Sequence, residues 1–260
     1  MLVTMHVEPV PCLSDNYAYL VTGTAGHTVV VDPSEAAPVR AALSRRGLAL
    51  VGIWATHHHH DHVGGIPALL QAFPGLEVLG SDYDGQQQRI PGLTRALHPG
   101  DPVWFESQRV RLLFVPGHTL GAVAYLCDGA LFSGDTLFGG GCGRVFEGTP
   151  EIMQSSLAAL RGLPANTRLY CGHEYTEKNL LFAQSIEPDN PAVAERLARV
   201  RERRSHNKPS VPSTLEEEWA TNPFLRWDAP AVIAKALRLG ANSDSPVAVF
   251  AALRRAKDTF

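Results

Sequence analysis

The chain has 260 residues and a formal net charge of −3, with 45% hydrophobic and 19% charged residues. This composition is typical of a globular protein with a proper core and excludes an intrinsically disordered chain. The slight negative charge argues against a phosphate-binding surface, so we expect no nucleic-acid partner.

The cysteine spacing and the opening residues predict the compartment. The four cysteines are widely separated and include no C-x-x-C pair, at Cys12, Cys127, Cys142 and Cys171. We therefore expect no disulfide framework and a reducing environment. Residues 1–11 lack the basic start and long apolar run of a leader peptide, and no apolar stretch reaches membrane-spanning length. These features predict a cytoplasmic protein with no membrane contact.

The first two thirds of the chain alternate short apolar or β-branched runs with glycine and proline, a pattern that predicts strands. The strands are expected at 27–33, 48–56, 76–81, 110–117, 122–129, 130–138 and 167–173. Helical spacing predicts helices at 64–75 and 149–164, the second with Thr149 as N-cap and Pro150 in its first turn.

Strand patterns disappear after residue 173, and helical patterns replace them. Helices are expected at 190–204 after an Asn-Pro cap, at 213–219 with a capping box from Ser213 to Glu216, and at 245–260 after Ser-Pro. We therefore predict two domains, a mixed domain over 1–173 and a helical domain over 174–260.

Residues 55–65, "ATHHHHDHVGG", hold five of the eleven histidines of the chain and one aspartate. The run follows a predicted strand, and residues two apart on extended backbone face the same way. We therefore expect His57 and His59 to point together, and His58 and His60 to point to the other side. Asp61 and His62 are expected to begin the next helix. Their nitrogen and oxygen donors suit zinc, iron or manganese.

Three later stretches place a candidate ligand directly after a glycine at the end of a predicted strand. They are "VPGH" with His118, "FSGD" with Asp135 and "YCGH" with His173. Any one of these alone would more often be an ordinary core, surface or turn residue, as we expect for His6, His27, His98 and His206. Together, five histidines and two aspartates exceed one tetrahedral site and suit two metals that share a bridging carboxylate and a bridging water. Asp32, in "VVVDP", is expected to support the site rather than to bind metal.

The segments "THHHHDHVGG", "PGH", "SGD" and "GHEYT", in this order, resemble the metallo-β-lactamase superfamily. The resemblance implies an α+β protein, an αββα sandwich followed by the C-terminal helical domain. It also implies one metal held by His57, His59 and His118 and a second held by Asp61, His62 and His173, with Asp135 bridging both.

Further segments resemble the glyoxalase II (hydroxyacylglutathione hydrolase) family over nearly the whole chain. They are "SDNYAYL", "GDTLFGGGCGRVFEGT", "GHEYTEKNL", "NPFLR" and "LRRAKD". This resemblance implies that the C-terminal domain and adjoining loops bind glutathione through Arg144, Tyr175, Arg254 and Lys257. Phe146 belongs to the same set but departs from the family, some members of which have tyrosine there.

The resemblance implies hydrolysis of S-(2-hydroxyacyl)glutathione, chiefly S-D-lactoylglutathione, in methylglyoxal detoxification. A hydroxide that bridges two divalent ions, with zinc preferred over iron or manganese, would attack the thioester. Asp61 and Asp135 would orient the nucleophile or move its proton, and we expect a monomer. The alternatives are another hydrolase of this fold, such as a lactonase, an iron-dependent persulfide dioxygenase, or a non-catalytic protein that binds glutathione or metal.

Overall fold

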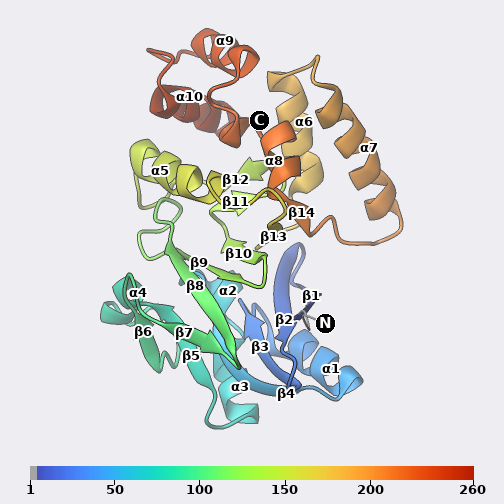
Figure 1. Ribbon diagram of the computed structural model, residues 1–260, viewed down its shortest axis with the longest axis vertical. Coiled ribbons are helices and arrows are strands. Elements are labelled where there is room, and N and C mark those ends of the chain that lie inside the picture. The colour runs from blue at the N-terminus through green and yellow to red at the C-terminus, as the bar shows by residue number, and fades with distance from the viewer. Residues whose placement is uncertain (1–4) are drawn as a thin grey trace. The chain divides into compact units, whose positions relative to one another are not determined.

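The computed structural model describes residues 5–260, which form two compact units (Figure 1). The first unit runs up to Phe114 and includes Gly121–Gly134; the second comprises Val115–Leu120 and Asp135–Phe260. No helix within residues 5–260 is long and apolar enough to span a membrane. The expectation that there is no leader peptide rests in part on residues 1–4, which lie outside the described residues. The functional boundary near residue 174 stays a prediction.

The first unit contains two sheets. One sheet has its strands in chain order, antiparallel between the first three and parallel from the third to the sixth. These are β1 (His6–Cys12), β2 (Asn16–Thr22), β3 (His27–Val31), β4 (Ala49–Trp54), β5 (Glu77–Ser81) and β6 (Arg95–Leu97). The other strands of this unit form an antiparallel run: β7 (Val103–Phe105), β8 (Gln108–Phe114), β9 (Val123–Cys127) and β10 (Ala130–Gly134). The helices are α1 (Ala36–Arg46), α2 (His60–Val63), α3 (Ile66–Ala72) and α4 (Asp82–Gln86).

The period of two along the strands gives the first sheet two apolar faces. One face packs on the antiparallel strands through aromatic rings, with Trp54 stacked on Tyr125 at 5.1 Å and Tyr19 at 5.6 Å from Phe132. The alternate residues, such as Ile53, join the core cluster formed with α1 and α3. Two packed sheets with helices on an outer face confirm the predicted α+β class.

The second unit is mainly helical. Its strands are β11 (Leu137–Phe138) paired with β12 (Gly141–Cys142), and β13 (Arg168–Cys171) paired with β14 (Ser213–Thr214). Its helices are α5 (Pro150–Arg161), α6 (Thr176–Ile186), α7 (Pro191–Ser205), α8 (Leu215–Thr221), a 3-10 turn η1 (Pro223–Leu225), α9 (Pro230–Arg238) and α10 (Pro246–Asp258). Thr149, Asn190 and Ser245 cap α5, α7 and α10 through their side chains, which confirms those predicted helix starts.

Two local predictions were wrong. The N-cap of α8 is Thr214, whose hydroxyl accepts from the amide of Glu217, and the predicted capping box from Ser213 does not form. The Ser213 hydroxyl instead donates to the buried carboxylate of Glu218 at 2.6 Å. The expected strand 130–138 is broken after Gly134, which has a φ of +49° that favours glycine.

We predict that Trp54→Ala lowers the free energy of unfolding by about 3–5 kcal/mol, because it leaves a cavity between the two sheets. The matched control is Trp104→Ala, since the Trp104 side chain is 60% exposed and its loss is expected to change stability by less than about 0.5 kcal/mol. Urea denaturation of both variants checks this. Equal effects would contradict the assigned role of Trp54.

Candidate metal centre

The histidine run follows β4 and leads into α2, as predicted. Ala55 donates its amide to the carbonyl of Leu79 in the neighbouring strand at 2.9 Å, so the chain stays extended past Trp54. His57 and His59 point the same way, with His57 Nε2 3.1 Å from His59 Nδ1, while His60 is exposed. The predicted common direction of the His57 and His59 side chains is therefore confirmed.

The buried carboxylate of Asp32 fixes both ends of this run. Its Oδ1 accepts from the amide of Thr56 at 2.8 Å, and its Oδ2 accepts from the Thr56 hydroxyl at 2.6 Å and from His62 Nδ1 at 2.9 Å. Since the hydroxyl proton is given to Asp32, Thr56 Oγ1 accepts from His57 Nδ1 at 3.0 Å. Both imidazoles are thereby held in the tautomer that leaves Nε2 as an electron-pair donor.

Asp61 is oriented by a residue to which the sequence reasoning gave no role. Asn16, in the segment "SDNYAYL", donates its amide to the Asp61 carboxylate at 3.1 Å and to its carbonyl at 2.9 Å. The Asp61 side chain is 40% exposed and lies 3.8 Å from His62 Nε2. The sequence does carry a signal for this role: Asn16 is a polar residue at the start of a buried strand, where its amide needs a polar partner such as the Asp61 carboxylate.

The second unit places three of the predicted ligands together. Asp135 Oδ2 lies 3.5 Å from His118 Nε2 and 3.3 Å from His173 Nε2, and all three side chains are buried. His118 Nδ1 donates to the carbonyl of Arg144 at 2.9 Å, so its Nε2 is also an electron-pair donor. The carboxylate of Asp135 is thus shared between two imidazoles.

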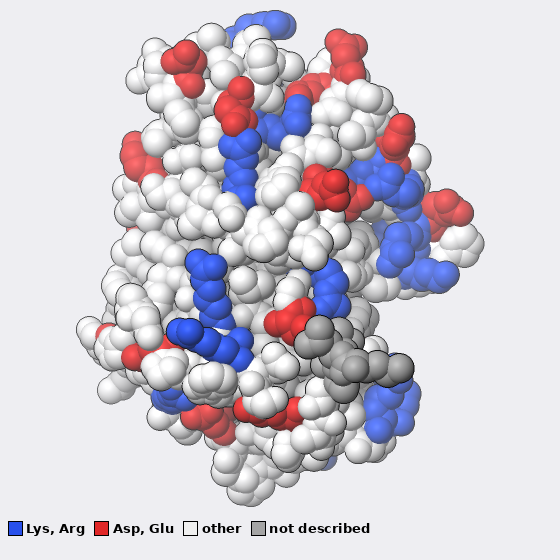
Figure 2. All heavy atoms as spheres, viewed as in Figure 1, with Lys and Arg blue, Asp and Glu red and all other residues white. Residues whose placement is uncertain are grey.

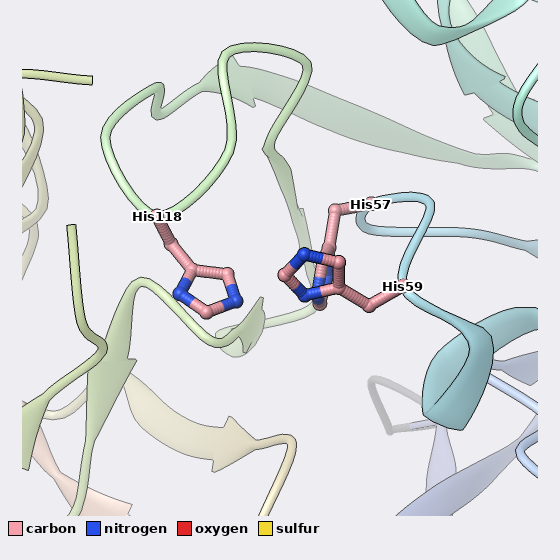
Figure 3. A group of neighbouring side chains, drawn as sticks. All are labelled: His57, His59 and His118. Carbon is pink, nitrogen blue, oxygen red and sulfur yellow. The ribbon is translucent and has the colours of Figure 1, made fainter. Parts of the chain in front are cut away.

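The donor atoms of the predicted ligands form groups that fit divalent metal ions. Figure 3 shows His57, His59 and His118 as neighbouring side chains, and their donor atoms lie within 4.8 Å of one another. The donor atoms of Asp61, His62 and His173 also lie within 4.8 Å of one another, as do those of Asp32, His57 and His62. Imidazole and carboxylate donors are those preferred by zinc and related ions. Because Asp32 Oδ2 already accepts two hydrogen bonds, we assign Asp32 to orientation rather than coordination.

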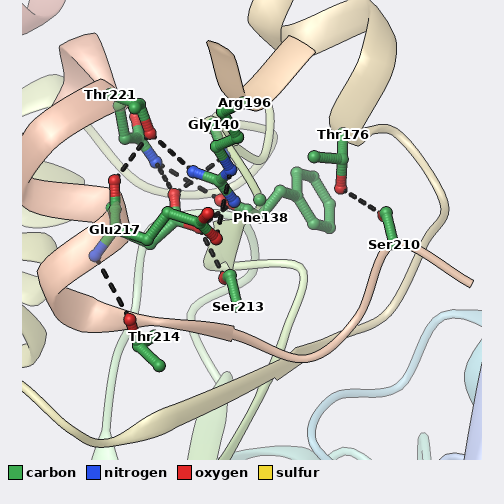
Figure 4. A network of polar contacts seen from close by, with 12 residues as sticks. Phe138, Gly140, Thr176, Arg196, Ser210, Ser213, Thr214, Glu217 and Thr221 are labelled. Carbon is green, nitrogen blue, oxygen red and sulfur yellow. Dashed lines mark hydrogen bonds and ion pairs between the residues drawn. The ribbon is translucent and has the colours of Figure 1, made fainter. Parts of the chain in front are cut away.

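A buried polar network fixes the glycine-rich hairpin β11–β12, which follows Asp135 and precedes Arg144 (Figure 4). The Glu218 carboxylate accepts from the amide of Gly140 at 2.8 Å and pairs with Arg196 at 2.5 Å. Asn222 donates to the carbonyls of Gly141 and Phe138 at 2.9 and 3.3 Å. Sequence reasoning missed these residues because their role depends on burial, which the sequence does not reveal.

The five residues predicted to bind glutathione occupy different environments. Arg144 and Phe146 are exposed, and the Phe146 ring lies 5.2 Å from that of His118. Tyr175 stacks on His173 with ring centroids 4.7 Å apart. Arg254 is buried and donates to the carbonyl of Cys142 at 2.8 Å, so its guanidinium holds the end of the glycine-rich hairpin.

Lys257 lies over the rings of Phe182 and Phe260, with its Nζ 5.2 and 5.1 Å from their centroids. Burial against these rings, together with the nearby charge of Arg254, lowers the pKa of Lys257 to about 8. This amine therefore loses its charge as the pH rises through about 8.

The four cysteines are free and buried, as expected in the absence of a disulfide framework. Burial raises the pKa of Cys142 to about 11, even though Arg254 lies beside it. A thiol with such a pKa is protonated at neutral pH and is a poor nucleophile, which favours a packing role for Cys142.

A basic run, "RLARVRERRSHNK" at 196–208, lies on α7 and the residues after it, where its arginines pair with acidic side chains of the same unit. Arg201 binds Glu177 at 2.9 Å, and Arg204 lies 3.6 Å from Glu174. On the face drawn in Figure 2, basic and acidic side chains of the described residues are interspersed among uncharged ones. This pairing favours a solvated helix face over a phosphate-binding surface.

We predict that Thr56→Val weakens zinc binding about 10–100-fold, because valine keeps the shape but removes the hydroxyl that links Asp32 to His57. Competition with a coloured chelator on the metal-free protein measures this. Thr22→Val is the control, since its hydroxyl contacts only Thr28 among the hydrogen bonds found for it within residues 5–260. An unchanged zinc affinity in Thr56→Val would contradict the orienting role.

Comparison with known proteins identifies the family. The metallo-beta-lactamase superfamily model matches residues 13–173, and the model for the hydroxyacylglutathione hydrolase C-terminus matches residues 174–260. The hydroxyacylglutathione hydrolase of Gloeobacter violaceus is 51% identical over 98% of this chain and 100% of its own length, and that of Aliivibrio salmonicida is 46% identical over 98% and 99%.

Solved structures share the fold. ETHE1 from Myxococcus xanthus has a TM-score of 0.65 at 22% identity, over 99% of both chains. TTHA1623, solved in a di-iron-bound form, has a TM-score of 0.59 at 28% identity, over 85% of this chain and all of its own. With both family models matched along the sequence and half of the residues shared with full-length relatives, the chain belongs to the hydroxyacylglutathione hydrolases, the glyoxalase II family of the metallo-β-lactamase superfamily.

Proposed function

We propose that this chain hydrolyses the thioester of S-(2-hydroxyacyl)glutathione, chiefly S-D-lactoylglutathione, to glutathione and the hydroxy acid. The observation that carries the proposal is the 51% identity to a hydroxyacylglutathione hydrolase over essentially the whole of both chains. The grouped histidine and aspartate donors add the chemistry that such a reaction needs.

The proposed cofactor is a pair of divalent ions, most simply zinc. His57, His59 and His118 would hold one ion, Asp61, His62 and His173 the other, and Asp135 both. Divalent ions held there lower the pKa of water toward neutrality and polarise a carbonyl oxygen. The Asp135 carboxylate, placed between His118 and His173, suits the bridging role.

The side chains themselves would orient the attacking water and move its proton. Asp61 combines a fixed position, set by Asn16, with 40% exposure, so it can pass a proton to solvent. Asp135 would help to align the nucleophile. The leaving thiolate needs no strong general acid.

Glutathione carries two carboxylates, and cations from this chain would bind them. We assign residues 1–173 to catalysis and 174–260, with the loop after Asp135, to glutathione binding. Arg144, Tyr175, Arg254 and Lys257 form the proposed site, with Phe146 beside it. Arg144 is exposed, with its Nε 3.6 Å from Asp258 Oδ1, and would exchange this exposed ion pair for a ligand carboxylate, whereas Arg254 would contribute mainly positive charge and the shape of the loop.

We further propose a monomeric, cytoplasmic enzyme of methylglyoxal detoxification with no nucleic-acid or membrane partner. The four free, buried cysteines are compatible with a reducing compartment.

The test is hydrolysis of S-D-lactoylglutathione by the purified protein, followed at the thioester absorbance, with metals quantified on the same sample. We expect rapid turnover and close to two ions per chain. His59→Ala should lose metal and activity together, whereas His98→Ala, an exposed histidine outside the donor groups, should retain both. Two ions without thioesterase activity would redirect the assignment to a lactone or another ester.

We also predict a rise in KM above pH 8, because Lys257 loses its charge there and a charge-assisted hydrogen bond to a glutathione carboxylate is lost. The expected rise is roughly tenfold, corresponding to about 1.5 kcal/mol. Lys257→Arg should keep the low KM and abolish its rise near pH 8, while Lys235→Arg on α9 should leave the profile unchanged. A profile identical in Lys257→Arg and the wild type would rule out this role.

A further inference from the structure

Three neighbouring parallel strands of the first unit end at one edge of the sheet, and each is followed by a polar residue. Asp32 follows β3, the histidine run follows β4, and Asp84 lies in α4 after β5. The carboxyl ends of parallel strands lie side by side, so the two aspartates flank the ligand run. Asp32 contacts the run through Thr56 and His62, whereas Asp84 contacts its middle.

The Asp84 carboxylate is completely buried and held from several directions. Its Oδ1 lies 3.2 Å from His58 Nδ1 and accepts from Arg89 Nε at 3.0 Å and Nη2 at 2.6 Å. The Asp84 amide donates to the hydroxyl of Ser81, the N-cap of α4. A charged side chain is buried in this way only when strong partners compensate its lost hydration.

The surroundings leave this carboxylate little freedom. A Cβ added to Gly121 would lie 2.5 Å from the Asp84 carboxylate atoms, so the backbone at 121 closes over it. The guanidinium of Arg89 also lies over the ring of Tyr83, at 5.2 Å. The Asp84 carboxylate is therefore held in one position, in contact with the His58 ring.

His58 stands between two proposed ligands, with its Nδ1 3.2 Å from Asp84 Oδ1 and its ring centroid 4.9 Å from that of His59. Its side chain is only 17% exposed, so it is not a solvated residue. It also belongs to none of the donor groups formed by the described residues. The peptide units on either side of His58 belong to His57 and His59. Holding the His58 ring consequently sets the backbone from which both ligands project.

We propose that Asp84 is a positioning residue for the metal centre, which acts through His58 to preorganise His57 and His59. This inference rests on the proposed metal binding of these two histidines. It assigns a function to His58, which is partly buried yet outside the proposed ligand set, and to a buried carboxylate that no other part of the mechanism uses.

The test is a zinc titration of metal-free protein by chelator competition, with unfolding temperature measured on the same metal-free samples. Asp84→Ala and His58→Ala should each weaken zinc binding about tenfold. Because one acts through the other, the double variant should bind zinc about as weakly as the weaker single variant. Asp84→Asn, which keeps an acceptor oxygen, should restore part of the loss, and kcat should fall more than KM changes.

Asp82→Ala is the matched control, because Asp82 is on the same helix and contacts His98 instead of the ligand run. Zinc affinity in Asp84→Ala equal to that in Asp82→Ala would overturn the proposal, as would losses that multiply to about a hundredfold in the double variant. If Asp84→Ala does not fold without metal, an unchanged affinity in His58→Ala overturns it. Failure of the wild type to bind zinc would instead contradict the proposed function.

Discussion

The metal centre depends first on the carboxylate of Asp32. It accepts three hydrogen bonds while 2% exposed, which offsets the cost of burying a charge. Two of them come from Thr56, immediately before the first proposed ligand, His57, and one from the ring of His62, the last proposed ligand of the run. A single side chain therefore fixes the distance between the two ends of a six-residue segment, before any ion binds. The φ of +47° at Asp32 is a local strain that this buried position maintains.

In the second unit, the buried carboxylate of Glu218 fixes the backbone in a similar way. Glu218 is fully buried, and Arg196 is nearly so, and replacing only one member of such a pair would leave an uncompensated charge. The hydrogen bond from Gly140 to Glu218 ties the pair to the hairpin that connects Asp135 with Arg144. The free energy lost in removing the two charges from water offsets much of the attraction between them, so the pair adds little to net stability. Its main contribution is to fix the position of the hairpin backbone.

The sequence predicted which donor residues lie together better than it predicted the residues that hold them in place, for a physical reason. His57, His59 and Asp61 follow an apolar strand at a spacing that only a few arrangements can use, so their pattern is local. The roles of Asn16, Asp84 and Glu218 arise from contacts with residues far away in the chain, and nothing in their neighbours signals burial. The Ser213 error has a different cause: two adjacent hydroxyl residues could both cap α8, and the buried carboxylate of Glu218, five residues further along the chain, takes the Ser213 hydroxyl and leaves the cap to Thr214.

Charge balance explains why so many neutral donors are gathered here. With two divalent ions, the carboxylates of Asp61 and Asp135 would neutralise half of the four positive charges, and the imidazoles would neutralise none. Asp32 lies within hydrogen-bond reach of His62 and would reduce the excess further. A site that stays positive favours the negative charge that develops on a thioester oxygen during attack. Replacing imidazoles with further carboxylates would hold the ions as well, but it would remove this excess charge and with it the advantage for the reaction.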